Sequence, residues 1–123
     1  GLCGYSDMRD VKQAISDGNE DAKLAYELYA YRIQKYIGTF SAALNGLDAI
    51  VFTAGIGEND EEMRAAVCQD MEFFGIYLDQ EKNAKRSSEI REINISGSKV
   101  KILVVPTNEE LEIGKQTFEL VNG

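Results

Sequence analysis

The apolar residues of this chain follow two spacings, one typical of helices and one of buried strands. From Ala22 to Leu44 they recur every three or four positions, as on one side of an amphipathic helix. Asn19 can cap this helix, and Asn45–Gly46 is expected to end it. We assign its aromatic residues to the core or to a subunit contact. Extra apolar positions widen the surface, so the helix is expected to be central or to meet a partner: Leu24, Leu28 and Tyr31.

Two short, almost continuous apolar runs predict strands buried on both faces of a parallel sheet. They are Asp48–Thr53 and Lys99–Val105, both rich in β-branched residues. A weaker strand is expected at residues 90–95, at the edge of the sheet. Residues 73–76 are expected to turn the chain back into the core, and residues 79–89 to lie on the surface.

Shorter helices are expected between and after these strands. Asp7–Asp17 is one. Asn59 is the expected cap of a second, with Glu62 completing a capping box, and Thr107 is the expected cap of a third. Strands that alternate with helices predict an α/β fold with a short, mostly parallel sheet. The final helix is expected to bury four positions: Leu111, Gly114, Phe118 and Val121.

Composition narrows the possible functions. The 123 residues form one domain by length, and the net charge of −8 argues against binding to nucleic acid or to an anionic membrane. No apolar run approaches the length of a membrane span, and no leader is visible, so we expect a cytoplasmic protein. Histidine is absent, which excludes a zinc cluster and catalysis by Ser-His-Asp or Cys-His groups within this chain. Cys3 and Cys68 do not suggest a disulfide framework.

A glycine-containing loop follows the first predicted strand: Gly55, Ile56, Gly57, Glu58 and Asn59. Ligands of α/β sheets bind beyond the carboxyl ends of strands, and glycines there let a ligand approach the backbone. A tight turn without a ligand is the alternative. The acidic residues at 58 and 60–62 would repel a phosphate, so the loop suits the ribose and base of a nucleotide better. It matches neither a Walker loop nor a complete Rossmann fingerprint.

The second predicted strand ends in an equivalent position, at Thr107–Glu110. Thr107 and Glu110 form a capping-box pattern, which leaves Glu109 without that structural role. Glu109 is therefore a candidate carboxylate ligand of a divalent cation, or else a favourable charge at a helix start.

A third candidate lies near the beginning of the chain, in Asp7, Met8 and Arg9. Arg9 can stack on a base or meet a phosphate. A surface ion pair in the first turn of a helix is the alternative.

Together these segments resemble the C-terminal part of the acetate kinase family. Each motif is weak alone, but they occur in one order and one register along residues 1–123. Residues 30–38 and 47–51 are also similar to the family. The segments that carry most of the resemblance are Ser6–Asp10, Phe52–Asn59 and Val105–Leu111.

The resemblance implies a two-lobed, actin-like ATPase (ribonuclease H-like) fold, of which residues 1–123 would be part of the C-terminal lobe. Acetate kinases use Mg²⁺ to transfer the γ-phosphoryl group of ATP to acetate, giving ADP and acetyl phosphate. By resemblance, Asp7, Met8 and Arg9 contact the nucleotide, residues 55–59 line its site, and Glu109 binds magnesium. Members of the family are dimers, so a homodimer is expected as well.

The chain departs from the family by its length. The family's main phosphate loop, its acetate-binding arginines and its catalytic aspartate lie upstream of the matched region. No residue of this chain is therefore assigned a catalytic role, and we expect the chain to be a fragment that is inactive alone. The alternatives are a propionate or butyrate kinase segment, a non-catalytic nucleotide-binding module, and a dimerisation module.

Overall fold

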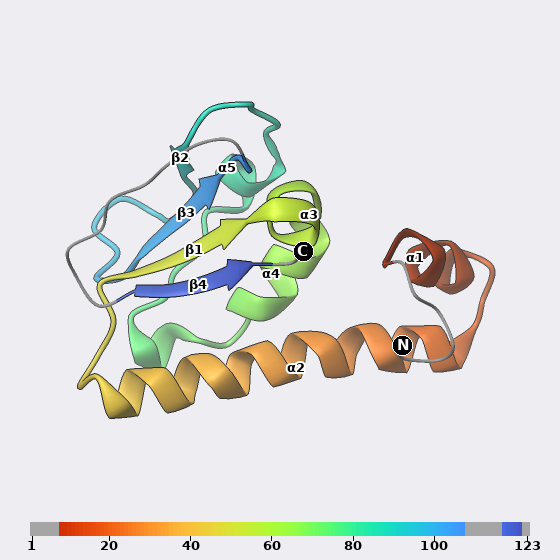
Figure 1. Ribbon diagram of the computed structural model, residues 1–123, viewed down its shortest axis with the longest axis horizontal. Coiled ribbons are helices and arrows are strands. Elements are labelled where there is room, and N and C mark those ends of the chain that lie inside the picture. The colour runs from red at the N-terminus through yellow and green to blue at the C-terminus, as the bar shows by residue number, and fades with distance from the viewer. Residues whose placement is uncertain (1–7, 108–116, 122–123) are drawn as a thin grey trace.

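A small four-stranded sheet forms the centre of the computed structural model, which describes residues 8–107 and 117–121 (Figure 1). The strand order is β2-β3-β1-β4. The central strand β1 pairs in parallel with both β3 and β4, and β2 pairs antiparallel with β3 at the edge. This confirms an α/β fold with a mostly parallel sheet. The strands are β1 (Ala49–Thr53), β2 (Arg91–Glu92), β3 (Lys101–Val105) and β4 (Thr117–Val121).

Helices lie beside the sheet, and the longest of them, α2, extends well beyond it. Asn19 caps α2 as predicted, because its side chain accepts a hydrogen bond from the Ala22 amide at 3.0 Å. Of the described helices, none is long and apolar enough to cross a membrane. The helical segments are α1 (Met8–Ser16), α2 (Glu20–Ala43), α3 (Ala54–Asn59), α4 (Glu61–Cys68), the 3₁₀ turn η2 (Glu72–Phe74) and α5 (Gln80–Ala84).

The main core packs one face of the sheet against α2 and α4. Ile50 of β1 lies opposite Ile102 of β3, and Phe52 lies opposite Val104, so these four side chains share one face. All four are fully buried. The helices and the intervening segments supply the opposing apolar side chains, among them Ile33, Ile37, Met63, Val67, Met71 and Ile76.

The expected final helix is wrong at its end. Residues 117–121 form strand β4, paired with β1 from Ala49 opposite Thr117 to Thr53 opposite Val121. Phe118 and Val121 therefore belong to a strand. The segment Thr-Phe-Glu-Leu-Val is rich in β-branched and aromatic residues, and pairing with β1 satisfies its backbone groups. The helix positions Leu111 and Gly114 lie outside the described residues.

The cap of α4 also differs from the prediction. Asn59 ends α3, where its side-chain amide donates to the Gly55 carbonyl at 3.1 Å. Asp60 caps α4 instead, accepting from the Met63 amide at 3.0 Å. Glu62 completes no capping box, and its carboxylate pairs with Lys12 at 3.2 Å. The extended backbone of Asp60 makes it the residue that can cap.

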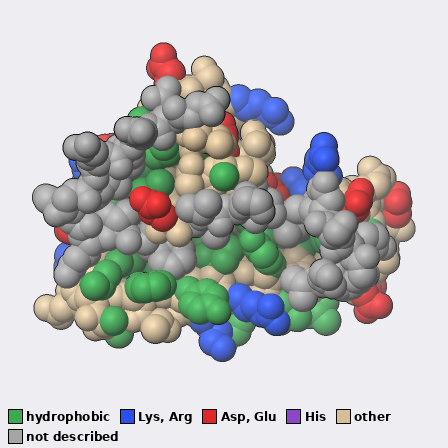
Figure 2. Space-filling view, viewed as in Figure 1, with side chains coloured by type: hydrophobic (Ala, Val, Ile, Leu, Met, Phe, Trp, Pro, Cys, Tyr) green, Lys and Arg blue, Asp and Glu red, His purple; other side chains and the backbone are tan. Residues whose placement is uncertain are grey.

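The outer side of α2 is exposed, so the helix is not buried on all sides. Its buried positions are Ala22, Ala25, Ala30, Ile33 and Ile37. Tyr26 and Tyr29 pack partly against the core. Figure 2 shows hydrophobic side chains along the edge of the molecule formed by α2. The large apolar residues of α2 that are 43–61% exposed are Leu24, Leu28, Tyr31, Tyr36 and Phe40. Of the two places predicted for the aromatic residues of this helix, the core is therefore excluded for Tyr36 and Phe40, and a subunit contact stays a prediction.

The segment after α4 returns to the core only in part. Ile76 is buried, and Gly75 has the left-handed φ of 83° that the turn before it needs. Phe73 is 93% exposed and stacks edge-on against Phe74. Asn83 in α5, expected on the surface, is 3% exposed. Its partner is a buried arginine.

Candidate functional site

The loops after β1 and β3 meet at one edge of the sheet. Thr53 ends β1 directly opposite Val105, which ends β3. Beyond them, a carboxylate oxygen of Glu58 accepts from the Thr107 hydroxyl at 2.9 Å and from its backbone N–H at 3.3 Å. Two of the three segments singled out in the sequence are therefore joined by direct hydrogen bonds. The predicted pairing of Thr107 with Glu110 lies outside the described residues.

The backbone turns sharply where β1 ends. Ala54 has a φ of 57°, and Gly55 follows with φ 26° and ψ −110°, which interrupts the helical stretch α3. A residue with a Cβ would be strained at the second position. Gly55 and Asn59 are exposed, Glu58 is half-buried and Gly57 is buried. The loop thus presents backbone to solvent at its start, as expected for a segment that a ligand approaches closely.

A buried arginine, which the sequence reasoning missed, fixes the second half of this loop. Arg64 of α4 is 2% exposed. Its Nη1 donates to the carbonyls of Gly57 at 3.1 Å and Glu58 at 2.8 Å. Its Nε and Nη2 donate to the side chain and carbonyl of Asn83, at 2.7 and 2.9 Å. Asn83 in turn donates to the Glu61 carbonyl at 2.9 Å. The guanidinium therefore ties α4, α5 and the loop together.

A cavity of about 390 Å³ opens beside the clamped loop. Four cationic side chains line it, and Glu58 and Glu61 are also present. Burial lowers the pKa of Arg91, and burial and then the Arg91 charge lower the pKa of Arg64. Within the described part of the chain, the buried Nε of Arg91 has no hydrogen-bond partner. The cavity is therefore cationic, which suits an oxygen- or nitrogen-rich ligand. The cationic lining residues are Arg64, Lys85, Arg86 and Arg91.

The N-terminal candidate segment lies on α1. Met8 begins this helix, Arg9 is exposed in its first turn, and Asp7 lies outside the described residues, as do the contacts of the Met8 side chain. Figure 1 shows α1 beside the N-terminal part of α2, on the side of the molecule toward which β1 runs. Lys12 of α1 reaches Asp60, the residue after the loop, at 3.2 Å. The structure thus links α1 to the loop.

The magnesium assignment rests on a residue outside the described part of the chain. Glu109 is not described, and the described residues contain no group of three or more potential metal ligands from His, Cys, Asp and Glu. Thr107, two residues earlier, is held at the loop by Glu58. A carboxylate that follows it is a hard oxygen donor of the type that Mg²⁺ prefers. The assignment of Glu109 to magnesium therefore stays a prediction from the resemblance.

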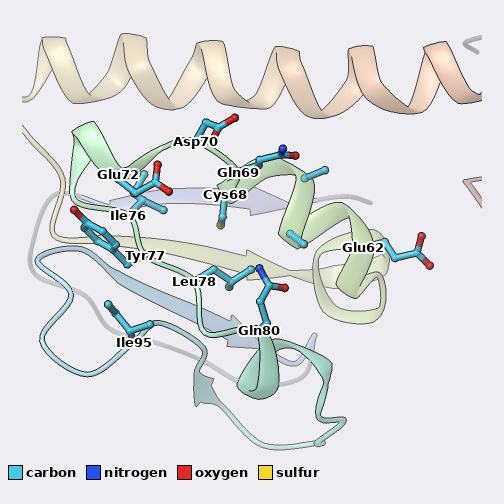
Figure 3. Close-up of a pocket in the computed structure, with 12 residues that line it drawn as sticks. Glu62, Cys68, Gln69, Asp70, Glu72, Ile76, Tyr77, Leu78, Gln80 and Ile95 are labelled. Atoms are coloured by element: carbon cyan, nitrogen blue, oxygen red, sulfur yellow. The ribbon is translucent and has the colours of Figure 1, made fainter.

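A second cavity, of about 470 Å³, contains none of the predicted site residues. Figure 3 shows Glu62 at one end of it and Glu72 and Tyr77 at the other, with Ile95 opposite α4. Its lining mixes apolar and acidic side chains without a buried, unpartnered polar group. We therefore place the candidate site at the carboxyl ends of β1 and β3.

Known proteins match this chain across the segments that form this edge of the sheet. The sequence profile of the Acetokinase family matches residues 1–115. The chain belongs to the acetate kinase family. It is 60% identical over 121 residues to an acetate kinase of Flavobacterium johnsoniae, an alignment covering 98% of this chain and 31% of that protein. The chain thus spans about a third of the length of such relatives and matches their C-terminal segment.

Solved structures confirm the fold within this family. The Porphyromonas gingivalis acetate kinase superposes with a TM-score of 0.82 at 46% identity, over 88% of this chain and 27% of that one. A propionate kinase from Francisella tularensis superposes with a TM-score of 0.75 at 39% identity, again over 88% of this chain and 27% of that one. The described sheet and helices are therefore part of an actin-like ATPase fold.

Proposed function

We propose that this chain is the nucleotide-side segment of an acetate kinase, which converts ATP and acetate to ADP and acetyl phosphate. The observation that carries the proposal is the junction of the two strand-end loops, Glu58 to Thr107, beside a cavity lined by cationic side chains. Family membership supplies the reaction class.

In this proposal the loop and cavity receive the nucleoside end of ATP. The exposed backbone at Gly55 lets the nucleoside approach closely, and Arg64 holds the carbonyls of Gly57 and Glu58 in hydrogen bonds. The donors of the cavity face the polar edges of the base and ribose. Gly55, Ile56, Gly57, Glu58 and Asn59 line this end of the site, as the resemblance implies.

The phosphate end is assigned away from the acidic start of α4. Asp7, Met8 and Arg9 contact the nucleotide, and Arg9 in the first turn of α1 adds positive charge there. Glu109 holds the Mg²⁺, which when bound neutralises phosphate charge during phosphoryl transfer. No catalytic residue is assigned to this chain. We expect the isolated chain to be inactive, since it spans about a third of its relatives.

A second acyl substrate has a specific observation in its favour. A propionate kinase shares the fold at 39% identity, so propionate is the alternative acceptor. We also propose a homodimer, because the exposed apolar side of α2 (Leu24, Leu28, Tyr31, Tyr36 and Phe40) is large for a surface that meets only water. Binding of nucleotide or assembly without catalysis remain the alternatives from other classes.

A chimera tests the proposal. The matching C-terminal segment of the Flavobacterium johnsoniae acetate kinase is replaced by this chain, and activity is measured with ATP and acetate or propionate. We expect a working enzyme whose KM for ATP rises at least about tenfold in Gly57→Val, since a side chain there displaces the clamped loop. Gly38→Val is the matched control, because a Cβ at Gly38 would meet only Phe74, at 3.8 Å.

The outcomes separate the alternatives. An inactive chimera beside an active parent enzyme would contradict the proposed function. An active chimera that tolerates Gly57→Val as well as Gly38→Val would contradict the assignment of the loop to the nucleotide.

A further inference from the structure

One buried carboxylate joins three helices directly behind the candidate loop. Asp60 follows Asn59 and is 7% exposed. Its side chain accepts from the Met63 amide of α4 at 3.0 Å, from Lys12 Nζ of α1 at 3.2 Å, and from the Tyr26 hydroxyl of α2 at 3.1 and 3.2 Å. Helix capping needs only the first of these bonds. The other two connect Asp60 to helices far away in the sequence.

Among the described residues, α1 packs against α2 through a small apolar cluster. Its apolar contacts form a small cluster of Val11, Ala14 and Ala22, separate from the main core, with Ile15 and Tyr26 at its margin. Three small or medium side chains bury little apolar surface. The polar link from Lys12 to Asp60 adds a second contact that fixes where α1 sits relative to α4.

The surrounding charges favour the ion pair between Lys12 and Asp60. Lys12 also pairs with Glu62 at 3.2 Å, but the Glu62 side chain is 70% exposed whereas that of Asp60 is 8% exposed. Burial lowers the pKa of Lys12, but its hydrogen bonds to Asp60 and Glu62 outweigh this, and the pKa is raised. Burial, and then the Asp60 charge, raise the pKa of Tyr26. Both partners of Asp60 therefore remain donors around neutral pH.

We infer that Asp60 is a positioning residue for the nucleotide: through Lys12 and Tyr26 it holds α1, which carries Arg9, in place against the loop of residues 55–59. The inference rests on the proposed function and goes beyond it, because Asp60 acts without touching the nucleotide. Two segments held in place before binding need not be ordered by the ligand, so affinity for the nucleotide rises while the chemical step is unaffected.

The test uses the chimera described above and three substitutions. Asp60→Asn keeps a capping acceptor on α4 but removes the charge that holds Lys12. Lys12→Met removes the other partner and keeps most of its aliphatic length. Glu62→Gln is the matched control, because it takes a carboxylate from the same ammonium group at the same distance, but from an exposed position.

Each of Asp60→Asn and Lys12→Met is expected to raise the KM for ATP roughly three- to tenfold, and the double variant by no more than the stronger single one, because both break one link. The KM for acetate, kcat and the control are expected to stay within about twofold. A substitution that merely weakened the fold would lower the melting temperature and the active fraction without moving the KM for ATP alone.

Results that contradict the positioning role differ from those that contradict the proposed function. Additive effects, equal rises in both KM values, or an unchanged KM for ATP in an active chimera that still responds to Gly57→Val would overturn the positioning role alone. An inactive chimera would overturn the proposed function and this inference together.

Discussion

Replacing Arg64 by methionine tests how the candidate loop is held. Methionine keeps much of the aliphatic volume of arginine and removes every donor. Four hydrogen bonds are lost, to the carbonyls of Gly57, Glu58 and Asn83 and to the Asn83 side chain. The acceptors remain where they are, so the cost depends on how many of them water can reach.

The magnitude follows from burial. Three of the four bonds are buried, and the bond to the Glu58 carbonyl is only partly buried. Each buried acceptor left unsatisfied costs about 1–3 kcal/mol, so the three together cost at least roughly 3 kcal/mol. That is a large part of the roughly 5–15 kcal/mol that stabilises an ordinary domain. Arg64→Lys should cost less than Arg64→Met, because the ammonium keeps the charge and some of the donors. It should still destabilise the chain, because one ammonium cannot reach both the loop and Asn83.

Urea unfolding of the 123-residue chain, followed by circular dichroism, measures this free energy. Arg32→Met is the matched control, because Arg32 lies exposed on α2, and it should change stability by no more than about 0.5 kcal/mol. In the chimera, Arg64→Met should also raise the KM for ATP, since the loop carbonyls are released. A loss of stability clearly below about 3 kcal/mol, or one no larger than in the control, would refute the reasoning.

Three further predictions concern other parts of the molecule. In the chimera, Glu58→Ala should raise the Mg²⁺ concentration needed for half-maximal activity several-fold, while the KM for acetate stays unchanged. The reason is that Thr107, two residues before Glu109, loses its hydrogen bonds to Glu58. An unchanged Mg²⁺ requirement would count against this. Burial raises the pKa of Cys68 from 9.0 to about 12, so unfolding titrations should show stability falling as pH rises through this interval, where only the unfolded thiol has ionised, and Cys68→Ala should fall less steeply. Tyr31→Glu should shift the chimera from dimer to monomer in sedimentation, and a dimer that persists would point to another contact surface.

Much of the fold follows from local patterns in the sequence. The two apolar, β-branched runs became the central strands β1 and β3, and Asn19 became the cap of α2, because burial on both faces and capping each leave a short-range signature. Strand β4 was mistaken for part of a helix. Its pairing with β1 is a long-range contact, and no spacing within residues 107–121 records it.

The place of the site was predictable from the sequence, but the residues that hold its loop in position were not. The loop at residues 55–59 and the one at Thr107 were recognisable as the ends of strands, and the structure joins them. Arg64 lies three positions before Val67 on the inner side of α4, which was a usable signal of a buried charge. Its partner Asn83 sits in a polar stretch, and only the tertiary structure shows that this residue is buried.

The central claim is that the nucleotide binds at the loop and cavity on the carboxyl ends of β1 and β3. Photolabelling of the chimera with an azido-substituted adenine nucleotide, followed by mapping of the labelled peptides, tests it most directly. The account predicts label within residues 55–64 or 83–91, reduced by excess ADP and by Gly57→Val. Label that ADP displaces but that lies elsewhere, for example along residues 68–78 of the second cavity, would contradict it.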